Sequence, residues 1–362
     1  MHRRLTGLLL ACLCTAHAAL RELPAPSKVK TELTTLANVA GGPVLAWTEV
    51  GINRQVRAAQ WDGQTWQALG GVINEDPTFN AAQLSSRTDR TGRVWLGWAE
   101  DAGIAHVDSW LMSVWDGQAW VRLTGAVRRN LSDAGRSRSF DVLPSGIPAL
   151  AWTDIHVQGA WGASVRSLRW NGQTWLQGTV LNELKYAGFA PDLRVGQGGR
   201  QTVAFLEGDY ARMNVVVAQQ GASGNWRRLG QPLNRHPDTF TATPKLALSP
   251  WGAAIVAWIE ADPQGPDRLY VSRQTGQAWQ ALGSTVSTGA GAAEQPALAL
   301  TPSSVRVAWL ENGVLHAAEW RGGDWRALGL PRTQHATGPS LSPDGQFLAV
   351  SDGGKLRVWA WE

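Results

Sequence analysis

Short runs of alternating apolar and polar residues cover most of the chain, and no segment keeps a helical period. Alternation with a period of two is typical of half-buried β-strands. The runs come in sets of four. Examples of the first, third and fourth run are 245–249 (KLALS), 56–61 (VRAAQW) and 66–70 (WQALG), and the second run reads Ala-Trp-x-Glu. The pattern predicts an all-β protein built from repeated four-stranded units.

The second run returns at a regular interval along the whole chain. Its final acidic residue is found at Glu49, Glu100, Asp154, Glu207, Glu260, Glu311 and Asp352, which gives spacings of 51, 54, 53, 53, 51 and 41 residues. A period of about 40–50 residues with four strands per unit is the signature of a β-propeller. We expect these acids to accept hydrogen bonds from the backbone of neighbouring loops.

A tryptophan turn follows each of the first six copies, first as WDGQTWQALG at residues 61–70. Asp62-Gly63, Asp116-Gly117 and Asn171-Gly172 lie between the third and fourth strands, where such pairs predict type I′ hairpins. Large rings at fixed strand positions are expected to fill the gaps between blades. The tryptophans assigned to this structural repeat are Trp47, Trp61, Trp66, Trp98, Trp115, Trp120, Trp152, Trp170, Trp175, Trp226, Trp258, Trp279, Trp309, Trp320 and Trp325.

The seventh unit is incomplete at the C-terminus, where segments 340–343, 347–352 and 355–361 supply three strands. The stretch 19–26 begins ALRELP and resembles the fourth strand of the preceding unit, 325–331. We therefore predict seven four-stranded blades, with the N-terminal segment as the outer strand that closes the ring. Six blades with an additional C-terminal hairpin are the alternative.

These repeats resemble the broad superfamily of bacterial propellers that includes sialidase-type repeats, lectin propellers and WD-type repeats. Residues 342–345 (SPDG) resemble a strand turn of periplasmic propellers of the TolB type. The resemblance covers residues 30–362 and concerns the architecture, because no single family matches residue by residue. It implies a binding or glycan-processing role.

Residues 1–18 have the pattern of a signal peptide, with a basic start, an apolar stretch and an A-x-A site at 16–18. We expect an exported protein, periplasmic or extracellular, with residues 19–362 as a single propeller domain. Lipidation at Cys12 is the alternative. Both cysteines, Cys12 and Cys14, lie in the signal, so the mature chain would have no disulfide or thiolate site.

Charge and composition narrow the class of partner. Removal of Arg3 and Arg4 leaves 31 basic against 29 acidic residues, a net charge of +2. This value gives no argument for nucleic acid. The apolar stretch at the N-terminus is too short to span a membrane, and the mature histidines have no metal-ligand spacing. We expect no cofactor, no metal, no transmembrane segment and a monomeric protein.

The connections between second and third strands, and between consecutive units, vary most in length and lie on one face of a propeller. Loops on a rigid scaffold often carry function, so we expect the ligand there, in the sector of units two to four. The candidate ligand-binding residues are Trp110, Arg128, Arg129, Arg136, Arg138, His156, Trp161, Tyr186, Asp209, Tyr210, Arg235 and His236.

Two functions compete at this point. The interpretation we favour is a non-catalytic binding or scaffolding module for a protein or a glycan, since aromatic rings and arginines suit sugars and their acidic groups. The alternative is a lectin-like or sialidase-like glycan-processing propeller. The sequence has no clean Asp-box and only three tyrosines, and it identifies no catalytic residue.

Overall fold

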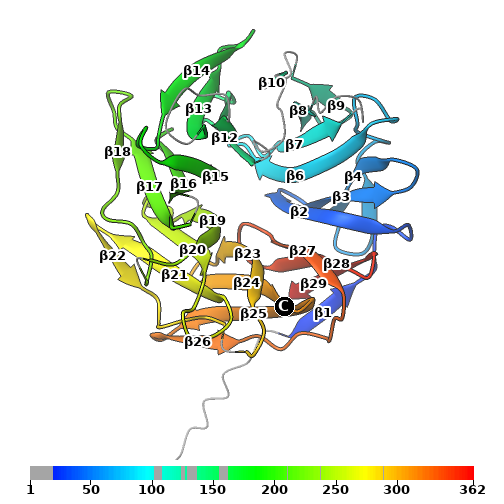
Figure 1. Cartoon of the computed structure of the whole chain (residues 1–362). Coiled ribbons are helices and arrows are strands. Elements are labelled where there is room, and N and C mark those ends of the chain that lie inside the picture. The colour runs from blue at the N-terminus through cyan, green and yellow to red at the C-terminus, as the bar shows by residue number, and fades with distance from the viewer. Residues whose placement is uncertain are drawn as a thin grey trace, which may run out of the picture.

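The computed structural model describes residues 19–101, 108–123, 127–128, 137–154, 162–209, 211–236, 238–287 and 289–362. Every regular element in these ranges is a β-strand. The strands form seven antiparallel sheets, and Figure 1 shows them arranged in a ring. The protein is a seven-bladed β-propeller, as predicted, and the six-bladed alternative is wrong.

Blades 1 to 6 take their strands in chain order from the centre outward, and blade 7 has the N-terminal strand as its outermost strand. Blade 1 consists of β2 (Thr31–Val39), β3 (Gly42–Val50), β4 (Arg54–Trp61) and β5 (Trp66–Ala68). Blade 2 consists of β6 (Asn80–Thr88), β7 (Val94–Asp101), β8 (Asp108–Trp115) and β9 (Trp120–Arg122), with β10 (Val127–Arg128) also paired to β8. Blade 3 consists of β11 (Arg138–Val142), β12 (Pro148–Asp154), β13 (Ser164–Trp170) and β14 (Trp175–Val180).

The remaining blades follow the same order. Blade 4 consists of β15 (Ala187–Val195), β16 (Gln201–Gly208), β17 (Met213–Gln220) and β18 (Trp226–Arg228). Blade 5 consists of β19 (Thr241–Leu248), β20 (Ala254–Glu260), β21 (Arg268–Thr275) and β22 (Ala278–Ala281). Blade 6 consists of β23 (Ala293–Leu300), β24 (Val305–Glu311), β25 (Val314–Arg321) and β26 (Asp324–Ala327). Blade 7 consists of β27 (Ala336–Leu341), β28 (Phe347–Asp352), β29 (Lys355–Trp361) and the N-terminal β1 (Leu20–Leu23).

The ring closes through the N-terminal strand. β1 pairs antiparallel with β29, with Leu20 opposite Trp361 and Leu23 opposite Val358. Leu23 is buried in the core between blades 7 and 1. Closure inside one blade joins the two ends of the ring by a strand ladder, and it leaves no unpaired sheet edge at the seam.

The inner strands are longer than the sequence predicted, because they continue through a β-bulge. In blade 5 the strand begins at Thr241 rather than 245, and its register shifts between Ala242 and Lys245. Thr243 in the bulge has a φ of 46° and is followed by Pro244. Proline normally ends a strand but is accommodated at bulges. Equivalent bulges place Pro191, Pro296 and Pro339 in blades 4, 6 and 7.

The tryptophan hairpins are present, but their turn type differs from the prediction. Trp61 pairs with Trp66, so the loop has four residues, and of these only Gly63 has a positive φ, 102°. Asp62 instead accepts hydrogen bonds from the backbone N–H groups of Gln64 and Thr65 at 2.8 and 2.7 Å. The aspartate therefore serves as a local cap, and the type I′ assignment is wrong here.

The repeated Leu-Gly and the second tryptophan form one contact between neighbouring blades. The Trp279 indole donates to the Leu229 carbonyl of the preceding blade at 2.6 Å. Gly230, with a φ of 72°, lies directly beneath that ring, where a Cβ would come within 3.0 Å of Trp279 Cδ1. The same contact joins Trp120 to Leu69 and Trp325 to Leu282. We call these contacts the outer seams.

The acids that end the second strands act inside the framework. Glu260 is fully buried and accepts hydrogen bonds from the Trp258 indole and from the backbone N–H groups of Arg235 and His236. Glu100 holds the loop before its own blade in the same way. Between each pair of neighbouring blades lies a cluster of buried apolar side chains, so the core consists of layers between blades.

Candidate functional site

The inner strands surround a central cavity of about 770 Å³. It extends along them from the proline bulges to the turns after the first strands, such as Pro144 and Gln197. Part of its wall is aliphatic and part carries the hydroxyls of Thr35, Ser139 and Ser340. A cavity of this size with convergent polar groups is the default place to look for a ligand.

Positive charge predominates in the cavity wall. Of the described lining residues, five are basic and two are acidic, a net charge of +3: Arg87, Arg90, Arg138, Arg194 and Lys245 against Asp141 and Asp192. Charges with the same sign in a narrow, weakly screened space attract oppositely charged ligands. The cavity is therefore suited to an anion.

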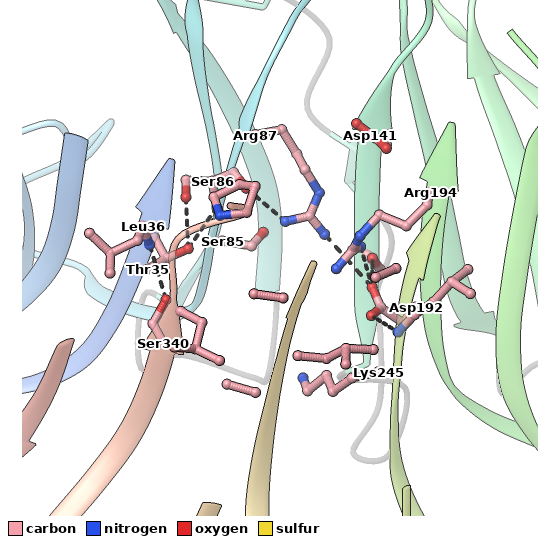
Figure 2. Close-up of a pocket in the computed structure, with 18 of the residues that line it drawn as sticks. Thr35, Leu36, Ser85, Ser86, Arg87, Asp141, Asp192, Arg194, Lys245 and Ser340 are labelled. Carbon is pink, nitrogen blue, oxygen red and sulfur yellow. Dashed lines mark hydrogen bonds and ion pairs between the residues drawn. The ribbon is translucent and has the colours of Figure 1, made fainter. Parts of the chain in front are cut away.

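Asp192 is the centre of the charged group, which Figure 2 shows on neighbouring strands. Its Oδ1 lies 2.5 Å from Arg194 Nη1 and 3.7 Å from Arg87 Nη2. The same oxygen accepts a hydrogen bond from Ser139 Oγ at 2.9 Å, and Oδ2 accepts one from the Leu246 N–H at 2.8 Å. This carboxylate is fully engaged by the protein.

The pKa values of the buried charged groups in the cavity wall are shifted in different directions. Burial raises the pKa of Asp141, and this effect exceeds the opposing influence of Arg87 and Arg194. Burial alone would raise the pKa of Asp192 too, but the charges of Arg194, Lys245 and Arg87 lower it overall. Burial lowers the pKa of Arg87 to about 10 and also lowers that of Lys245. With a pKa near 10, Arg87 remains charged at neutral pH.

A ring of hydrogen bonds joins the inner strands around the cavity. Blades 6 and 7 are joined by a hydrogen bond from the Gly338 N–H to Gln295 Oε1 at 2.8 Å. At four other junctions among the described residues, one aligned position of the inner strands accepts through its side chain from a backbone N–H of the next blade. The pairs are Leu36 N with Ser340 Oγ at 3.0 Å, Ser86 N with Thr35 Oγ1 at 3.1 Å, Leu193 N with Ser139 Oγ at 3.0 Å, and Leu246 N with Asp192 Oδ2 at 2.8 Å. We call this the inner ring.

Two residues selected from the sequence meet beside this cavity. Arg138, which begins β11, lines the cavity and lies with its guanidinium carbon 5.8 Å from the centre of the Trp110 ring. Trp110 is 1% exposed and packs in the core between blades 2 and 3. Its ring supports Arg138 from behind and offers no exposed surface to a ligand.

Arg235 and His236 meet on the connection between blades 4 and 5. His236 Nδ1 lies 3.1 Å from Glu260 Oε1, and the Arg235 guanidinium lies 5.8 Å from the centre of the Tyr270 ring. The His236 and Tyr270 rings meet edge to face at 6.5 Å. Burial raises the pKa of Tyr270, and the nearby carboxylate of Glu260 adds to this effect.

The other candidates are dispersed or lie outside the description. Tyr186 is half exposed, with Lys185 Nζ 4.8 Å from its ring centre, and Asp209 accepts a hydrogen bond from the Arg212 N–H in an exposed turn. Arg128 lies in β10, and its side chain is outside the described part. The candidates outside the described residues are Arg129, Arg136, His156, Trp161 and Tyr210.

Sequence reasoning missed six charged residues of the cavity: Arg87, Arg90, Asp141, Asp192, Arg194 and Lys245. Two of them, Asp192 and Lys245, become conspicuous when the blades are aligned by strand register. Ala46 of β3 lies opposite Thr35, and the matching alanines of β16 and β20 lie opposite Asp192 and Lys245. Charged residues thus replace a small hydroxyl at one fixed position of the repeat.

Other kinds of site receive no support from the described residues. Among them, no three His, Cys, Asp or Glu side chains gather closely enough to hold a metal ion. The ranges described above also contain no helix of the length and hydropathy needed to cross a membrane.

Comparison with protein families and with curated protein sequences gives no match. Solved structures share the fold. An ulvan lyase of polysaccharide lyase family PL25, solved bound to -[GlcA(1-4)Rha3S]-, has a TM-score of 0.61 at 13% identity, covering 93% of this chain and 95% of that chain. The propeller domain of Myceliophteria thermophila Cps50 (Swd1) has a TM-score of 0.58 at 14% identity, covering 94% and 99%. Virginiamycin B lyase from Staphylococcus aureus has a TM-score of 0.53 at 12% identity, covering 94% and 99%. These likenesses show the propeller fold.

Proposed function

We propose that this propeller is a non-catalytic binding protein that holds an acidic saccharide in its central cavity. The observation that carries the proposal is the wall of the cavity, where five basic side chains face two carboxylates among hydroxyl groups. Basic side chains recognise carboxylates and sulfates, and hydroxyls exchange hydrogen bonds with sugar hydroxyls. The volume of about 770 Å³ lies in the usual range for small-ligand sites.

Two further points support a glycan as the ligand. The ulvan lyase with the same fold was solved bound to a saccharide that contains glucuronate and sulfated rhamnose, both acidic. The connections between blades include the longest in the chain, such as residues 229–240, and we propose that the saccharide enters from their face. A protein ligand is the competing partner.

The direct test is a glycan array with residues 19–362 that contains neutral and acidic polysaccharides. We expect acidic glycans to bind and Lys245→Met to lose them. Lys185→Met, which removes an exposed lysine outside the cavity, is the matched control and should bind like the wild type. A blank array, or binding of neutral glycans that Lys245→Met retains, would contradict the proposal. A blank array would direct the search to protein partners.

A glycan-processing enzyme is the second candidate, and one cluster favours it. His236, Glu260 and Tyr270 bring an imidazole, a carboxylate and a phenol together on the loop face, and these groups serve in general acid–base catalysis. Incubation with the glycans found on the array separates the two functions. New reducing ends or unsaturated ends that disappear in His236→Ala would establish catalysis, and intact glycans support binding alone.

We also propose that the protein acts outside the cytoplasm, in the periplasm or beyond the cell, on the basis of the signal-like residues 1–18. Mass spectrometry of the purified exported protein tests this location. A mature N-terminus near Ala19 is expected. An intact chain that stays in the cytoplasm would contradict it, and a lipid on Cys12 would establish the anchored alternative.

A further inference from the structure

One position of the inner strands changes from blade to blade although its place in the fold is constant. In the strand ladder this position pairs with the alanine or glycine of the second strand, for example Ala46 in blade 1 and Gly97 in blade 2. In chain order the position holds Thr35, Ser85, Ser139, Asp192, Lys245, Ala297 and Ser340. Thr35, Ser139, Asp192 and Ser340 are the acceptors of the inner ring.

The other three positions, Ser85, Lys245 and Ala297, are not acceptors. Ser85 carries a hydroxyl that donates to the Gly97 carbonyl of its own blade. Lys245 and Ala297 interrupt the inner ring by their chemistry, since an ammonium and a methyl group cannot accept a hydrogen bond. The next-blade N–H groups at these junctions belong to Leu298 and Leu341. Leu298 pairs with Val307 in the same register as Leu246 with Val256. In an antiparallel ladder, residues in the same register direct their N–H groups to the same side. The Leu298 and Leu341 N–H groups therefore face the cavity, and no described side chain accepts from either.

The Lys245 side chain extends into the cavity, as Figure 2 shows. Its ammonium makes no hydrogen bond or ion pair within the described residues, in contrast to Arg194, which donates to Asp192. The lining of the cavity in blades 5 and 6 includes the small side chains of Ala247, Ala297 and Ala299. A cation, free N–H groups and room for a ligand thus coincide at blades 5 and 6.

Blade 4 shows what completes such a junction. Asp192 places one carboxylate oxygen 2.8 Å from the Leu246 N–H while the other accepts from Ser139 and Arg194. We propose that a uronic acid carboxylate of the ligand takes the equivalent place at the next junctions, between the Lys245 ammonium and the Leu298 and Leu341 N–H groups. The ligand supplies the acceptor that the chain lacks. This inference rests on the proposed function and specifies which part of the saccharide is recognised and where.

The affinity test uses isothermal titration calorimetry with a glucuronate oligosaccharide and with its methyl ester, which keeps the shape and removes the charge. We expect the wild type to bind the carboxylate about ten- to a hundredfold more tightly than the ester. Lys245→Met is expected to lose this preference, and Lys185→Met to keep it. Equal affinity for acid and ester, or an unchanged preference in Lys245→Met, would overturn the inference.

A second test needs no ligand. Ala297→Ser introduces the hydroxyl present in blades 1, 3 and 7, and Lys245→Asp introduces the carboxylate of blade 4. Ala297→Ser is expected to raise the melting temperature by about 1–3 °C, and both variants should weaken glucuronate binding about tenfold or more.

The outcomes separate the two proposals. Binding of glycans that none of these variants alters would overturn the inference and leave a saccharide-binding function. Absence of glycan binding together with an unchanged melting temperature in Ala297→Ser would overturn both. Stabilisation by Ala297→Ser without any glycan binding would overturn both proposals about the ligand and show only that the junction lacks an acceptor.

Discussion

The outer seams and the inner ring join the same blades in opposite ways. At the outer seams the partners repeat, and the Trp120, Trp279 and Trp325 indoles each donate to a leucine carbonyl at 2.6–2.7 Å. At the inner ring the partners change, from hydroxyls to Asp192, Lys245 and Ala297. The repeated contacts hold the blades together. The inner-ring positions that depart from the repeat mark the part of the cavity where we propose that a ligand binds.

The largest effect is expected where the ring is closed. Deletion of residues 19–26 removes β1, exposes the edge of β29 and takes Leu23 out of the core. Loss of the strand ladder and of this burial should lower the free energy of unfolding by more than about 3 kcal/mol. Chemical denaturation measures it.

Arg21→Ala is the control for this deletion, because it breaks only an exposed ion pair with Glu362. Its effect should stay within about 0.5 kcal/mol. A deletion variant as stable as Arg21→Ala would show that β1 does not hold the ring together.

A smaller effect is expected at a single outer seam. Gly230→Ala places a methyl group 3.0 Å from Trp279 Cδ1 at a residue with a φ of 72°. Overpacking of this kind costs about 1–3 kcal/mol beyond the cost of the backbone conformation, and urea unfolding should detect it.

Gly276→Ala is matched to this variant, since its φ is 63° and a Cβ there meets nothing within 4 Å. The difference between the two variants isolates the contacts of the added methyl group with the next blade, which are Trp279 and the Gln277 carbonyl. Equal destabilisation would mean that the glycine serves the turn alone, and the outer seams would lose their role.

The smallest expected effect is on stability at acid pH. It concerns Asp89 in the turn between β6 and β7, which belongs neither to the outer seams nor to the inner ring. Burial alone would raise the pKa of Asp89, but hydrogen bonds from Trp95, Thr91 and Arg93 lower it to about 2. A lowered folded-state pKa contributes stability above the ordinary value near 3.8, and this is lost as the pH falls toward 2. Asp89→Asn should destabilise by about 1–2 kcal/mol at pH 7.

Thermal unfolding from pH 7 to pH 2 checks this prediction. The gap in melting temperature between the wild type and Asp89→Asn should narrow as the pH falls from 4 toward 2, because the unfolded wild type takes up a proton on Asp89 before the folded protein does. A gap that is independent of pH would show that the Asp89 charge contributes nothing to stability.

The repeat made the fold predictable, because each feature appears several times in the sequence. Ala-Trp-x-Glu located the second strands, and the likeness of 19–26 to 325–331 located the closing strand. The turn type at Asp62 was wrong because an aspartate side chain can cap a four-residue loop. The inner strands were predicted too short because the bulge at Thr243-Pro244 looks like a strand end.

The site was less predictable, because its residues are conspicuous only by comparison between blades. Lys245 was assigned to an inner strand, but nothing local distinguishes it from a solvent-facing lysine. Lys245 becomes a candidate ligand-binding residue only when it is compared with Asp192 and Ala297, which occupy the same position in blades 4 and 6. Loop arginines and aromatics, in contrast, stood out for their residue type, and Trp110 among them is buried.

The central claim is that the interrupted junctions of the inner ring receive the ligand, and amide NMR tests it most directly. A ¹H–¹⁵N titration of the mature chain with a glucuronate oligosaccharide should shift the Leu298 and Leu341 amides, as each gains an acceptor. The Leu246 amide, already held by Asp192, should stay in place. Shifts confined to the loop face or to the exposed Trp251, with Leu298 and Leu341 unmoved, would contradict the account.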